Sequence, residues 1–402
     1  MLQNEEIERS LHNGRFRITG PDRITGSDSA MADNATFAGQ AVRMLINRPL
    51  SIGTDCSGLD VPVLALVALR VTHEHLFSSD IDKIVKKQHR RSLRPKLWFD
   101  DLMRRNNKSS EAPAVDLYCA GFPCQPFSAA GEGRGFKDKR GRGKIFFGCA
   151  DYIRHQRPKV FILENVHRLL HIHGGKTFAS VMRTLRRIGP AAYDVQFEVL
   201  DTQHHGVPQS RRRVYIVGIR KDCQRAKISF PKPLLRAASL KNFLDPVEHA
   251  PTREDLPPEK NMNARQNVQN ILEQLAAQGH MPLTETFCID HESSPHRCGY
   301  MKDKVMCMTR SRPRGHWITS HGRVMNLDEM HRCQGMKRDR SKQVVTDRQM
   351  GALLGNAMSQ NVLERLLCKV LPAAGLVDGL VDRWEIPMNA RPVEVIDLRL
   401  LL

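Results

Sequence analysis

A cysteine set between two prolines is the residue whose surroundings most clearly favour chemistry. Cys124 stands in the run Ala120-Gly-Phe-Pro-Cys-Gln-Pro-Phe-Ser128. Proline fixes the backbone φ angle, so the chain on both sides of the thiol is stiff. Cysteine is nucleophilic as the thiolate, which nearby cations favour, and residues 134–144 carry six basic residues and one acid. A single cysteine is more often a small buried apolar residue than a nucleophile, so this assignment depends on further residues.

A carboxylate closes a later apolar run. Glu164 follows Val160-Phe-Ile-Leu and precedes Asn165 and Val166. A carboxyl group that is partly removed from water can hold a proton near neutral pH and act as an acid. Taken alone, such a residue is equally well explained as a salt-bridge partner or as a neighbour of a helix N-cap.

Two arginines stand at alternate positions in Gln209-Ser-Arg-Arg-Arg-Val-Tyr-Ile-Val-Gly218. Side chains alternate along a strand, so Arg211 and Arg213 share one face and Arg212 takes the other. Two guanidinium groups on one face can orient a carboxylate, grip a phosphate or stabilise a thiolate. Without the other residues, a solvated strand end would be the simpler interpretation.

These residues follow or end short apolar runs that predict a parallel sheet. From Leu50 onward such runs alternate with longer helical patterns, which is typical of βαβ units. The expected strands are 50–54, 75–79, 115–119, 159–163, 195–199 and 213–219, and the expected helices are 62–69, 145–155 and 178–188. Helical character returns from Leu327, and a further amphipathic helix over 355–371 is expected behind a Gly-Asn turn.

Length and composition narrow the class of protein. The chain has 402 residues, with 62 Lys and Arg against 43 Asp and Glu, a net charge of +19. This charge favours nucleic acid as a partner, although a basic surface that confers solubility explains it equally. No run approaches the ~20 apolar residues of a membrane helix, and the first residues lack the apolar core of a secretory signal. The ten cysteines show no dense spacing, so reduced thiols in an intracellular soluble protein are expected.

In this order the three segments resemble the DNA cytosine-5 methyltransferases: a Pro-Cys-Gln loop, a Glu-Asn-Val strand end and a Gln-x-Arg-x-Arg strand. Gly355-Asn356-Ala357 and the run RVMNLDEMHRCQG at 323–335, through Glu329, Arg332, Gln334 and Gly335, complete the resemblance. Each motif is weak alone, but five in the right order are specific. The resemblance covers about residues 50–221 and 319–371. It implies an α/β fold, a doubly wound and mostly parallel Rossmann-like methyltransferase sheet, with a smaller irregular target-recognition domain.

The resemblance also implies a reaction: transfer of a methyl group from S-adenosylmethionine to C5 of cytosine in double-stranded DNA. Cys124 matches the nucleophile that adds to C6, and Glu164 matches the residue that protonates or hydrogen-bonds N3. Arg211 and Arg213 match the pair that holds the base and the acid in place. The target atom is inaccessible inside a duplex, so the base has to be flipped out, into a pocket that is expected to be lined by Phe122, Pro123 and Gln125.

The expected cofactor turn departs from the family pattern. Thr54 stands at the usual Asp, Cys56 at the usual aromatic residue, and Asp60-Val61 at the second glycine pair. The missing aromatic removes a stacking surface for adenine, which puts cofactor affinity in question. Asp80 closes the second strand and fits the acid that binds ribose hydroxyls. The resemblance assigns cofactor binding to Ser57, Gly58, Asp80, Ile81, Asp101, Leu102, Gly121, Asn356 and Met358.

The resemblance divides the chain into five segments. They are an irregular N-terminal extension (1–45), a catalytic and cofactor-binding domain (46–221), a target-recognition domain (222–318), a return segment that completes the catalytic domain (319–385) and a C-terminal tail (386–402). Between Arg297 and Arg314, six basic residues and one acid suit phosphate contact. The spacing of Cys288, His291, His296, Cys298 and Cys307 matches no familiar zinc ligand set, so no metal is expected.

Two other activities remain compatible with this fold. A branch of tRNA cytosine-5 methyltransferases shares the architecture but typically carries a Cys-Phe-Thr segment in its recognition region, and none occurs here. A non-catalytic, DNA-binding regulatory relative is suggested by the altered cofactor turn, whereas the intact Cys124, Glu164, Arg211 and Arg213 argue against it. A monomer is expected, placed in the nucleus of a eukaryotic host or in the cytoplasm of a bacterial one.

Overall fold

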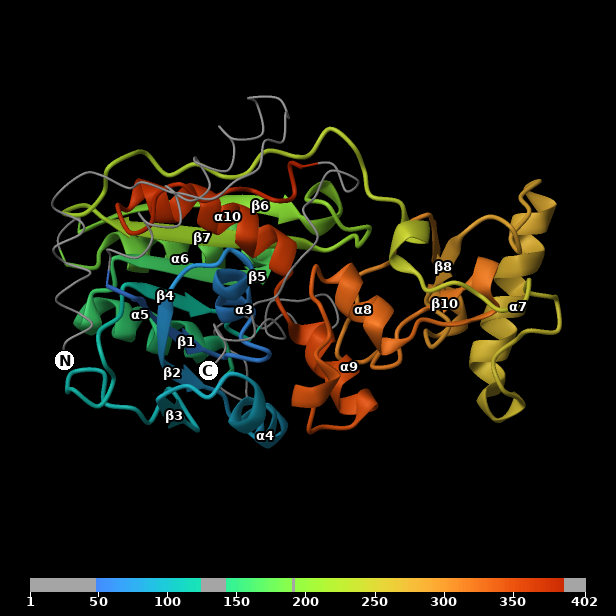
Figure 1. The fold of residues 1–402 in the computed structure, drawn as a ribbon, viewed down its shortest axis with the longest axis horizontal. Coiled ribbons are helices and arrows are strands. Elements are labelled where there is room, and N and C mark those ends of the chain that lie inside the picture. Colours follow the sequence, from blue (N-terminus) through green and yellow to red (C-terminus); the bar gives the residue numbers. More distant parts are fainter. Residues whose placement is uncertain (1–47, 124–141, 190–191, 387–402) are drawn as a thin grey trace, which may run out of the picture. The chain divides into compact units, whose positions relative to one another are not determined.

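The computed structural model describes residues 48–123, 142–189 and 192–386. Cys124, Gln125 and the two terminal segments predicted above lie outside the described residues. The largest element is a seven-stranded sheet with the order β3-β2-β1-β4-β5-β7-β6 (Figure 1). Its strands are β1 (Leu50–Asp55), β2 (His73–Ser79), β3 (Leu97–Phe99), β4 (Leu117–Ala120), β5 (Val160–Val166), β6 (Tyr193–Asp201) and β7 (Arg212–Arg220).

The pairing of these strands confirms the predicted mixed, mostly parallel sheet. The pairs β1–β2, β1–β4, β2–β3 and β4–β5 are parallel, whereas β7 runs antiparallel to both β5 and β6. The six predicted strands all occur, within a few residues of their predicted bounds. Parallel strands are buried on both faces and are therefore continuous apolar runs, which is why Val160-Phe-Ile-Leu was readable in the sequence.

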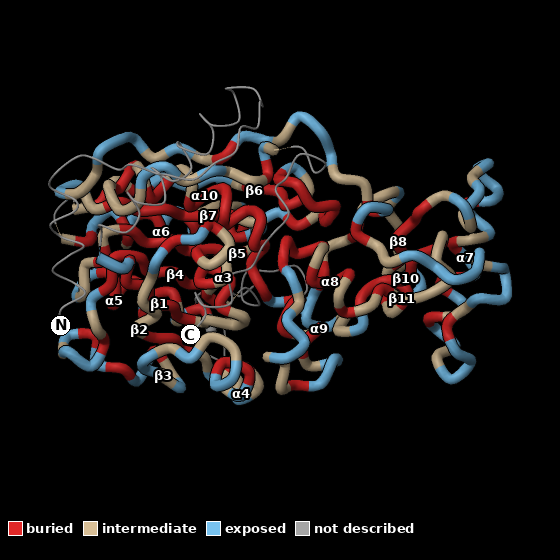
Figure 2. The backbone as a smooth tube through the Cα atoms, viewed as in Figure 1, coloured by how far each residue is buried: buried red, intermediate tan, exposed pale blue. Residues whose placement is uncertain are grey.

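Helices cover both faces of this sheet, and each face has its own core (Figures 1 and 2). One core joins the sheet to α3 (Val61–Ala68) and α10 (Gln360–Ala373). The other joins it to α5 (Ile145–Gln156) and α6 (Lys176–Arg186). The buried apolar residues of α6 are Phe178, Val181, Met182 and Leu185. The remaining helices near the sheet are α4 (Lys83–Ser92), α8 (Leu327–Cys333) and α9 (Asp347–Asn356).

The segment after β7 contains a second sheet that the sequence did not predict in detail. Four short strands form an antiparallel sheet with the order β11-β10-β8-β9. A 16-residue helix, α7 (Met262–Ala277), packs Val268, Ile271 and Leu275 against it. The strands are β8 (Phe287–Ile289), β9 (Tyr300–Lys302), β10 (Trp317–Ile318) and β11 (Arg323–Val324). This sheet runs beyond residue 318, where the sequence places the end of the recognition domain.

One predicted helix has a different start. The sequence predicts a single helix over 355–371 behind a Gly-Asn turn, but Gly355 and Asn356 are the last residues of α9. Ala357 is extended, with φ −64° and ψ 149°, and α10 begins at Gln360. The interruption has a physical cause, because the carbonyl groups of Gly355 and Ala357 accept hydrogen bonds from Arg211 instead of continuing a helix.

Candidate functional site

The predicted acid, Glu164, forms an ion pair with Arg213 across two neighbouring strands. In the antiparallel register of β5 and β7, Glu164 lies opposite Tyr215 and Val166 lies opposite Arg213. Arg213 is therefore the diagonal neighbour of Glu164 on the same face of the sheet. The Arg213 Nε to Glu164 Oε1 distance is 3.1 Å, and both side chains are largely buried. The strand pairing itself thus orients the acid.

Burial sets the proton affinity of Glu164. Removal from water raises the pKa of its carboxyl group, and the positive charges of Arg213 and Arg211 offset this effect only in part. The pKa of Glu164 therefore lies above that of an exposed glutamate. A carboxyl group in this state can carry a proton closer to neutral pH than an ordinary one, as expected for an acid.

Arg211 is held differently from Arg213. Its side chain is 2% exposed, and its guanidinium group donates to the carbonyl oxygens of Met308 (2.9 Å) and Ala357 (2.6 Å) and, at longer range, Gly355. No hydrogen bond between Arg211 and Glu164 occurs among the described residues. The resemblance assigns this arginine to holding the base and the acid, whereas its observed contacts fasten two backbone segments, at Met308 and at 355–357.

Cys307 is a member of this site that the sequence considered only as a metal ligand. Its Sγ accepts from Arg211 Nη1 at 3.4 Å and from Arg213 Nη2 at 3.6 Å. Both arginines therefore face the same side, as the strand alternation predicts. Burial alone would raise the pKa of the Cys307 thiol, but the two guanidinium groups outweigh it and the pKa is lowered. Cys307 precedes Met308, and no sequence motif marked it.

The backbone that leads into Cys124 lies beside Glu164. β4 ends at Ala120, and a methyl group placed on Gly121 would lie 3.6 Å from Glu164 Oε2 and 3.0 Å from Met358 Cε. The next residue, Phe122, is buried, and its carbonyl oxygen accepts from Asn165 Nδ2 at 2.9 Å. Pro123 is the last described residue before Cys124. Three predicted site residues, Gly121, Glu164 and Met358, are thereby brought together.

Gly355 has a steric role in this arrangement, which a substitution can test. A methyl group on Gly355 would overlap the backbone of Thr309 and Arg310. Overpacking against backbone that cannot yield costs about 1–3 kcal/mol. Gly355→Ala is therefore expected to lower the free energy of unfolding by that amount, measured by urea denaturation. Gly299→Ala is the matched control, because nothing lies within 4 Å of its added methyl; equal losses in both variants would contradict this role.

The expected cofactor residues meet where β1 and β2 end. Ser57 Oγ lies 2.8 Å from Thr54 Oγ1 and accepts from the Ser79 amide at 3.0 Å. The Asp80 carboxylate accepts from the backbone N–H groups of Gly58 (3.1 Å) and Asp82 (2.9 Å). The pKa of Asp80 is raised, because the effect of burial exceeds the opposing effect of these two hydrogen bonds. The acid is thus held in a fixed position beside the glycine turn.

The other predicted cofactor residues differ in how far their side chains are exposed. Ile81, next to Asp80, is 78% exposed, so its apolar side chain is open to contact. The Asp80 N–H donates to Phe99 at the end of β3, which places Asp101 nearby. Leu102 is buried against α5, so it can offer a ligand only its backbone. Asn356 is exposed at the end of α9.

Asp60, at the position of a missing glycine, adopts the left-handed conformation that a glycine would, with φ +53°. Its carboxylate is fully buried, accepts from Ser78 Oγ at 2.6 Å, and lies 3.3 Å from His75 Nε2 and 3.4 Å from His89 Nδ1. Burial raises the pKa of Asp60, but the two histidines and Ser78 outweigh this, and the pKa is lowered. Aspartate tolerates this backbone region better than most residues, so the turn survives the substitution.

An unpredicted ion pair lies under the same turn. Asp55, the last residue of β1, accepts two hydrogen bonds from the guanidinium group of Arg105, at 2.9 and 2.7 Å, and one from Tyr118 Oη at 2.6 Å. Both charged side chains are completely buried. The Arg105 guanidinium lies 4.8 to 5.0 Å from the ring centres of Phe77, Phe99 and Tyr152. β1 is therefore anchored through a charge pair inside an aromatic cluster.

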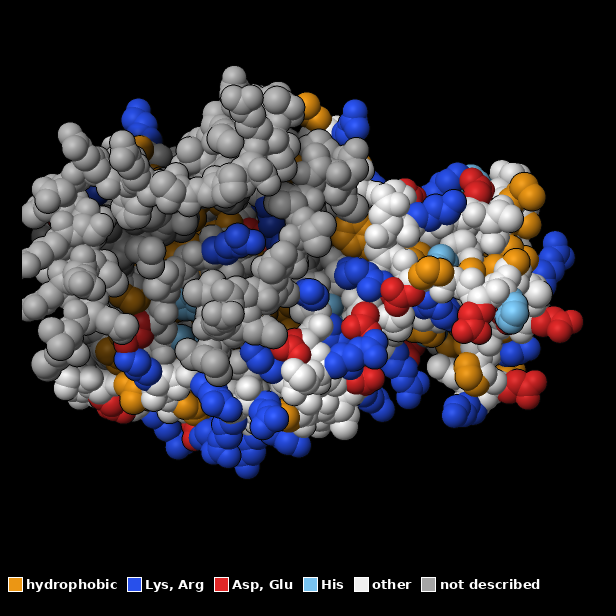
Figure 3. All heavy atoms as spheres, viewed as in Figure 1, with side chains coloured by type: hydrophobic (Ala, Val, Ile, Leu, Met, Phe, Trp, Pro, Cys, Tyr) orange, Lys and Arg blue, Asp and Glu red, His pale blue; other side chains and the backbone are white. Residues whose placement is uncertain are grey.

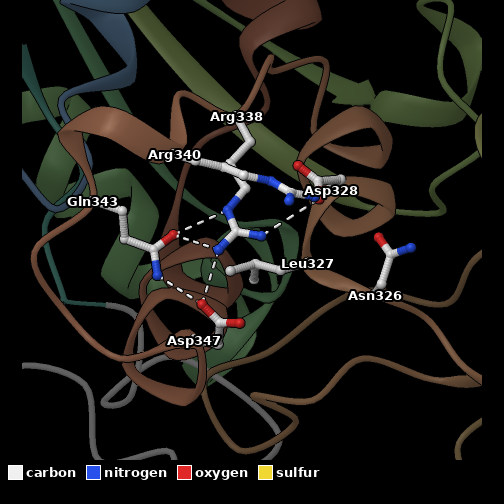
Figure 4. A pocket seen from close by; sticks show the side chains of 7 residues that line it. All are labelled: Asn326, Leu327, Asp328, Arg338, Arg340, Gln343 and Asp347. Carbon is white, nitrogen blue, oxygen red and sulfur yellow. Dashed lines mark hydrogen bonds and ion pairs between the residues drawn. The ribbon is translucent and has the colours of Figure 1, made fainter.

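A pocket of about 420 Å³ elsewhere on the protein shows no free binding groups (Figure 4). Arg338 crosses it and donates to Gln343 Oε1 at 3.0 and 2.8 Å and to Asp347 at 2.8 Å, and it pairs with Asp328. These polar groups satisfy one another, so this pocket is not a candidate site. Among the described residues no His, Cys, Asp or Glu cluster could hold a metal ion, and no helix is long and apolar enough to cross a membrane.

Comparisons with known proteins agree with this fold. The family model described as C-5 cytosine-specific DNA methylase matches residues 64–371. The type II methyltransferase M.NgoBI of Neisseria gonorrhoeae is 32% identical over 77% of this chain and 91% of its own length. The type II methyltransferase M.HaeII of Haemophilus aegyptius is 37% identical over 44% of this chain, and the match spans about half, 52%, of that relative.

A solved structure is similar in fold. The Entamoeba histolytica methyltransferase EhMeth superposes with a TM-score of 0.57 at 15% identity, covering 81% of this chain and 99% of that one. The match to the family model extends over most of the chain and includes both Glu164 and the two arginines. The chain belongs to the family of C-5 cytosine-specific DNA methylases.

Proposed function

We propose that this protein transfers a methyl group to C5 of cytosine in double-stranded DNA through a covalent bond between Cys124 and C6 of the base. One observation carries the proposal: a buried carboxyl group with a raised pKa, Glu164, is fixed by Arg213 beside the backbone that leads into Cys124. Family membership gives the reaction class, and the placement of Glu164 and Arg213 supports the proposed acid.

The chemistry follows from the weak nucleophilicity of cytosine C5. The Cys124 thiolate forms a bond to C6 while Glu164 delivers its proton to, or hydrogen-bonds, N3, which makes C5 electron-rich. S-adenosylmethionine, when bound, supplies the methyl group from its sulfonium. After methylation H5 is lost as a proton to solvent water, the C5–H electrons form the C5–C6 double bond, and the C6–S bond breaks to release the Cys124 thiolate. Glu164 regains its proton from N3. Arg213 keeps the acid aimed, and Arg211 fixes the backbone behind it.

The residues at the ends of β1 and β2 fit S-adenosylmethionine. The Asp80 carboxylate, held by Gly58 and Asp82, suits the ribose hydroxyls, and the exposed Ile81 offers an apolar face to the adenine. Cys56 stands where the family has an aromatic residue, so Ile81 and the backbone of Leu102 take a larger share of adenine contact. Gly121, Asn356 and Met358 are assigned to the methionine end, where Gly121 and Met358 meet.

The segment between β7 and α8 is assigned to target recognition. It contains the four-stranded sheet and α7, and it rejoins the catalytic site through residues 305–309, whose Val305 N–H donates to Pro208 and whose Met308 carbonyl accepts from Arg211. We place the recognition domain at 222–318, with β11 continuing its sheet, and the return segment at 319–385.

Covalent trapping tests the proposed function. Fluorine at C5 blocks the loss of H5, so a mixed-sequence duplex containing 5-fluorocytosine, with S-adenosylmethionine, is expected to leave DNA attached to the peptide that carries Cys124. Cys124→Ser is the control and should form no adduct while keeping its circular dichroism spectrum. An adduct on another cysteine would overturn the assignment of Cys124. An adduct that forms with tRNA and not with DNA would overturn the assignment of DNA as the substrate.

A further inference from the structure

Helix α4 carries a row of positive charges on its solvent face. Lys83, Lys87, Arg90, Arg91 and Arg94, here called the α4 stripe, are all exposed. Within the helix, Lys83, Lys87, Arg90 and Arg91 stand three or four residues from one another along the row, the spacing at which side chains share one helix face. Arg94 follows just beyond the end of the helix. The buried face is formed by Val85, Gln88 and His89. Figure 3 shows Lys and Arg side chains gathered over α4 at the lower edge of the view.

Not all cations of the α4 stripe stabilise the helix that carries them. Cations near a helix C-terminus interact favourably with the helix dipole, which accounts for Arg90 and Arg91. Lys83, however, is the first residue of the helix, where the N-cap carboxylate of Asp82 accepts from the Ile84 N–H at 2.9 Å and is the nearest acid. Lys83 and Lys87 also repel each other at the i,i+4 distance. An external anion would offset this repulsion.

Neighbouring acids are engaged elsewhere. Asp100 pairs with Lys86 at 2.6 Å and Asp82 pairs with Arg310 at 3.0 Å. Among the described residues no ion pair or side-chain hydrogen bond reaches Lys83, Lys87, Arg91 or Arg94. Within the described part of the chain, these four cations therefore have no ion-pair partner, whereas Arg90 lies in the field of Asp100.

The cationic surface continues beyond the helix. Gln88 of α4 donates to the Lys342 carbonyl at 2.9 Å and accepts from the Val344 N–H at 3.1 Å, which fixes Lys342 beside the helix. Ile84 of α4 also lines a pocket of about 450 Å³ together with Arg310 and Arg348. Three separate parts of the chain thus contribute cations to one surface.

We propose that the α4 stripe binds the phosphate backbone of double-stranded DNA outside the bases that enter the catalytic site. This inference rests on the proposed function. From Lys83 to Arg91 the helical part of the stripe is about 12 Å long at 1.5 Å per residue, which matches roughly three to four base pairs at 3.4 Å each. A row of flexible cations without aromatic or amide neighbours on the same face suits phosphates and not base edges. The stripe therefore adds affinity that does not depend on sequence.

The salt dependence of DNA binding tests this directly. Each phosphate contact contributes about −0.9 to the slope of log K against log salt. The variant K83Q/K87Q/R91Q/R94Q removes four cations, so the magnitude of the slope is expected to fall by about 3.6 with a long mixed-sequence duplex between about 50 and 200 mM salt. Its methyl transfer at saturating DNA and low salt should equal that of the wild type. The control, K176Q/R183Q/R186Q/R187Q, removes three exposed cations from α6 and a fourth from its C-cap, Arg187, and should keep the wild-type slope.

The outcomes separate the alternatives. Equal slopes in the wild type and both variants, or equal losses in both variants, would overturn the proposal, because the stripe would then act no differently from any other positive surface. A stripe-dependent slope with double-stranded RNA or polyglutamate, but not with DNA, would assign the surface to another partner. A wild-type protein that binds DNA with a stripe-dependent slope but transfers no methyl group would overturn the proposed function and leave this surface standing.

Discussion

Replacing Glu164 by glutamine is expected to slow methyl transfer by about 10²- to 10⁴-fold, the usual contribution of a positioned acid. Glutamine is isosteric and keeps an oxygen for Arg213 Nε, which lies 3.1 Å from the native carboxylate, but it has no proton to give to N3. The measurement is single-turnover transfer of a labelled methyl group to unmethylated DNA. DNA binding should be unchanged, and unaltered turnover would remove Glu164 from its proposed role.

The same variant also gives a prediction about the pH dependence of stability. The pKa of Glu164 is raised above its ordinary 4.5 because the carboxyl group is buried. The folded state therefore binds this proton more tightly than the unfolded state, and the stability contributed by Glu164 falls as the pH rises from about 4.5 through the raised pKa. Glutamine cannot titrate, so Glu164→Gln should gain stability relative to the wild type across that window. Urea midpoints that diverge in the opposite direction would contradict the raised pKa.

Arg105→Met is expected to lower the free energy of unfolding by about 3–5 kcal/mol, the usual cost of breaking a buried ion pair from one side. The change leaves the Asp55 carboxylate fully buried, with Tyr118 Oη as its remaining partner in the pair's network. Because Asp55 ends β1 immediately before the proposed cofactor turn, affinity for S-adenosylmethionine should fall as well. Urea denaturation and calorimetric titration measure the two effects.

Two control variants test whether the loss in Arg105→Met comes from the unpaired buried charge. The double variant Asp55→Asn with Arg105→Met removes both charges and should be more stable than Arg105→Met alone, because no unpaired charge remains buried. Arg340→Met breaks an exposed pair with Asp328, whose arginine side chain is 75% exposed, and should cost no more than about 1 kcal/mol. If Arg105→Met cost as little as Arg340→Met, the buried pair would not anchor β1.

The sheet was predictable because its buried strands are recognisable in the sequence. Val160-Phe-Ile-Leu and Val214-Tyr-Ile-Val are buried on both sides, so burial leaves a continuous apolar run that needs no periodicity to be seen. Helix α4 was not predicted, because two of its buried residues, Gln88 and His89, are polar. Its sequence therefore shows no apolar stripe among the many cations. Helix α7 was missed for a related reason: its buried residues include Asn267, which donates to the His291 carbonyl.

The parts of the site that depend on the alternation of side chains along one strand were predictable. The parts that depend on contacts between segments far apart in the sequence were not. Strand alternation placed Arg211 and Arg213 on one face, and the structure adds that only Arg213 pairs with Glu164. Cys307 reaches the arginines because residues 305–309 run alongside Gln209 and Gly355, and no local pattern encodes such a return. The Asp55–Arg105 pair joins residues 50 positions apart, which spacing alone does not reveal.

The packing of α10 on α3 has a consequence for the order in which the chain can fold during synthesis. All seven strands of the large sheet are complete once residue 220 has been made. One face of that sheet, however, is closed by α10, a nearly fully buried helix that begins at Gln360 and packs against α3. Until then α3 and β1 expose apolar surface on the ribosome, and such surfaces promote aggregation. A fragment that ends at residue 221 is therefore expected to be insoluble, and the intact chain to depend on chaperones while it is being made.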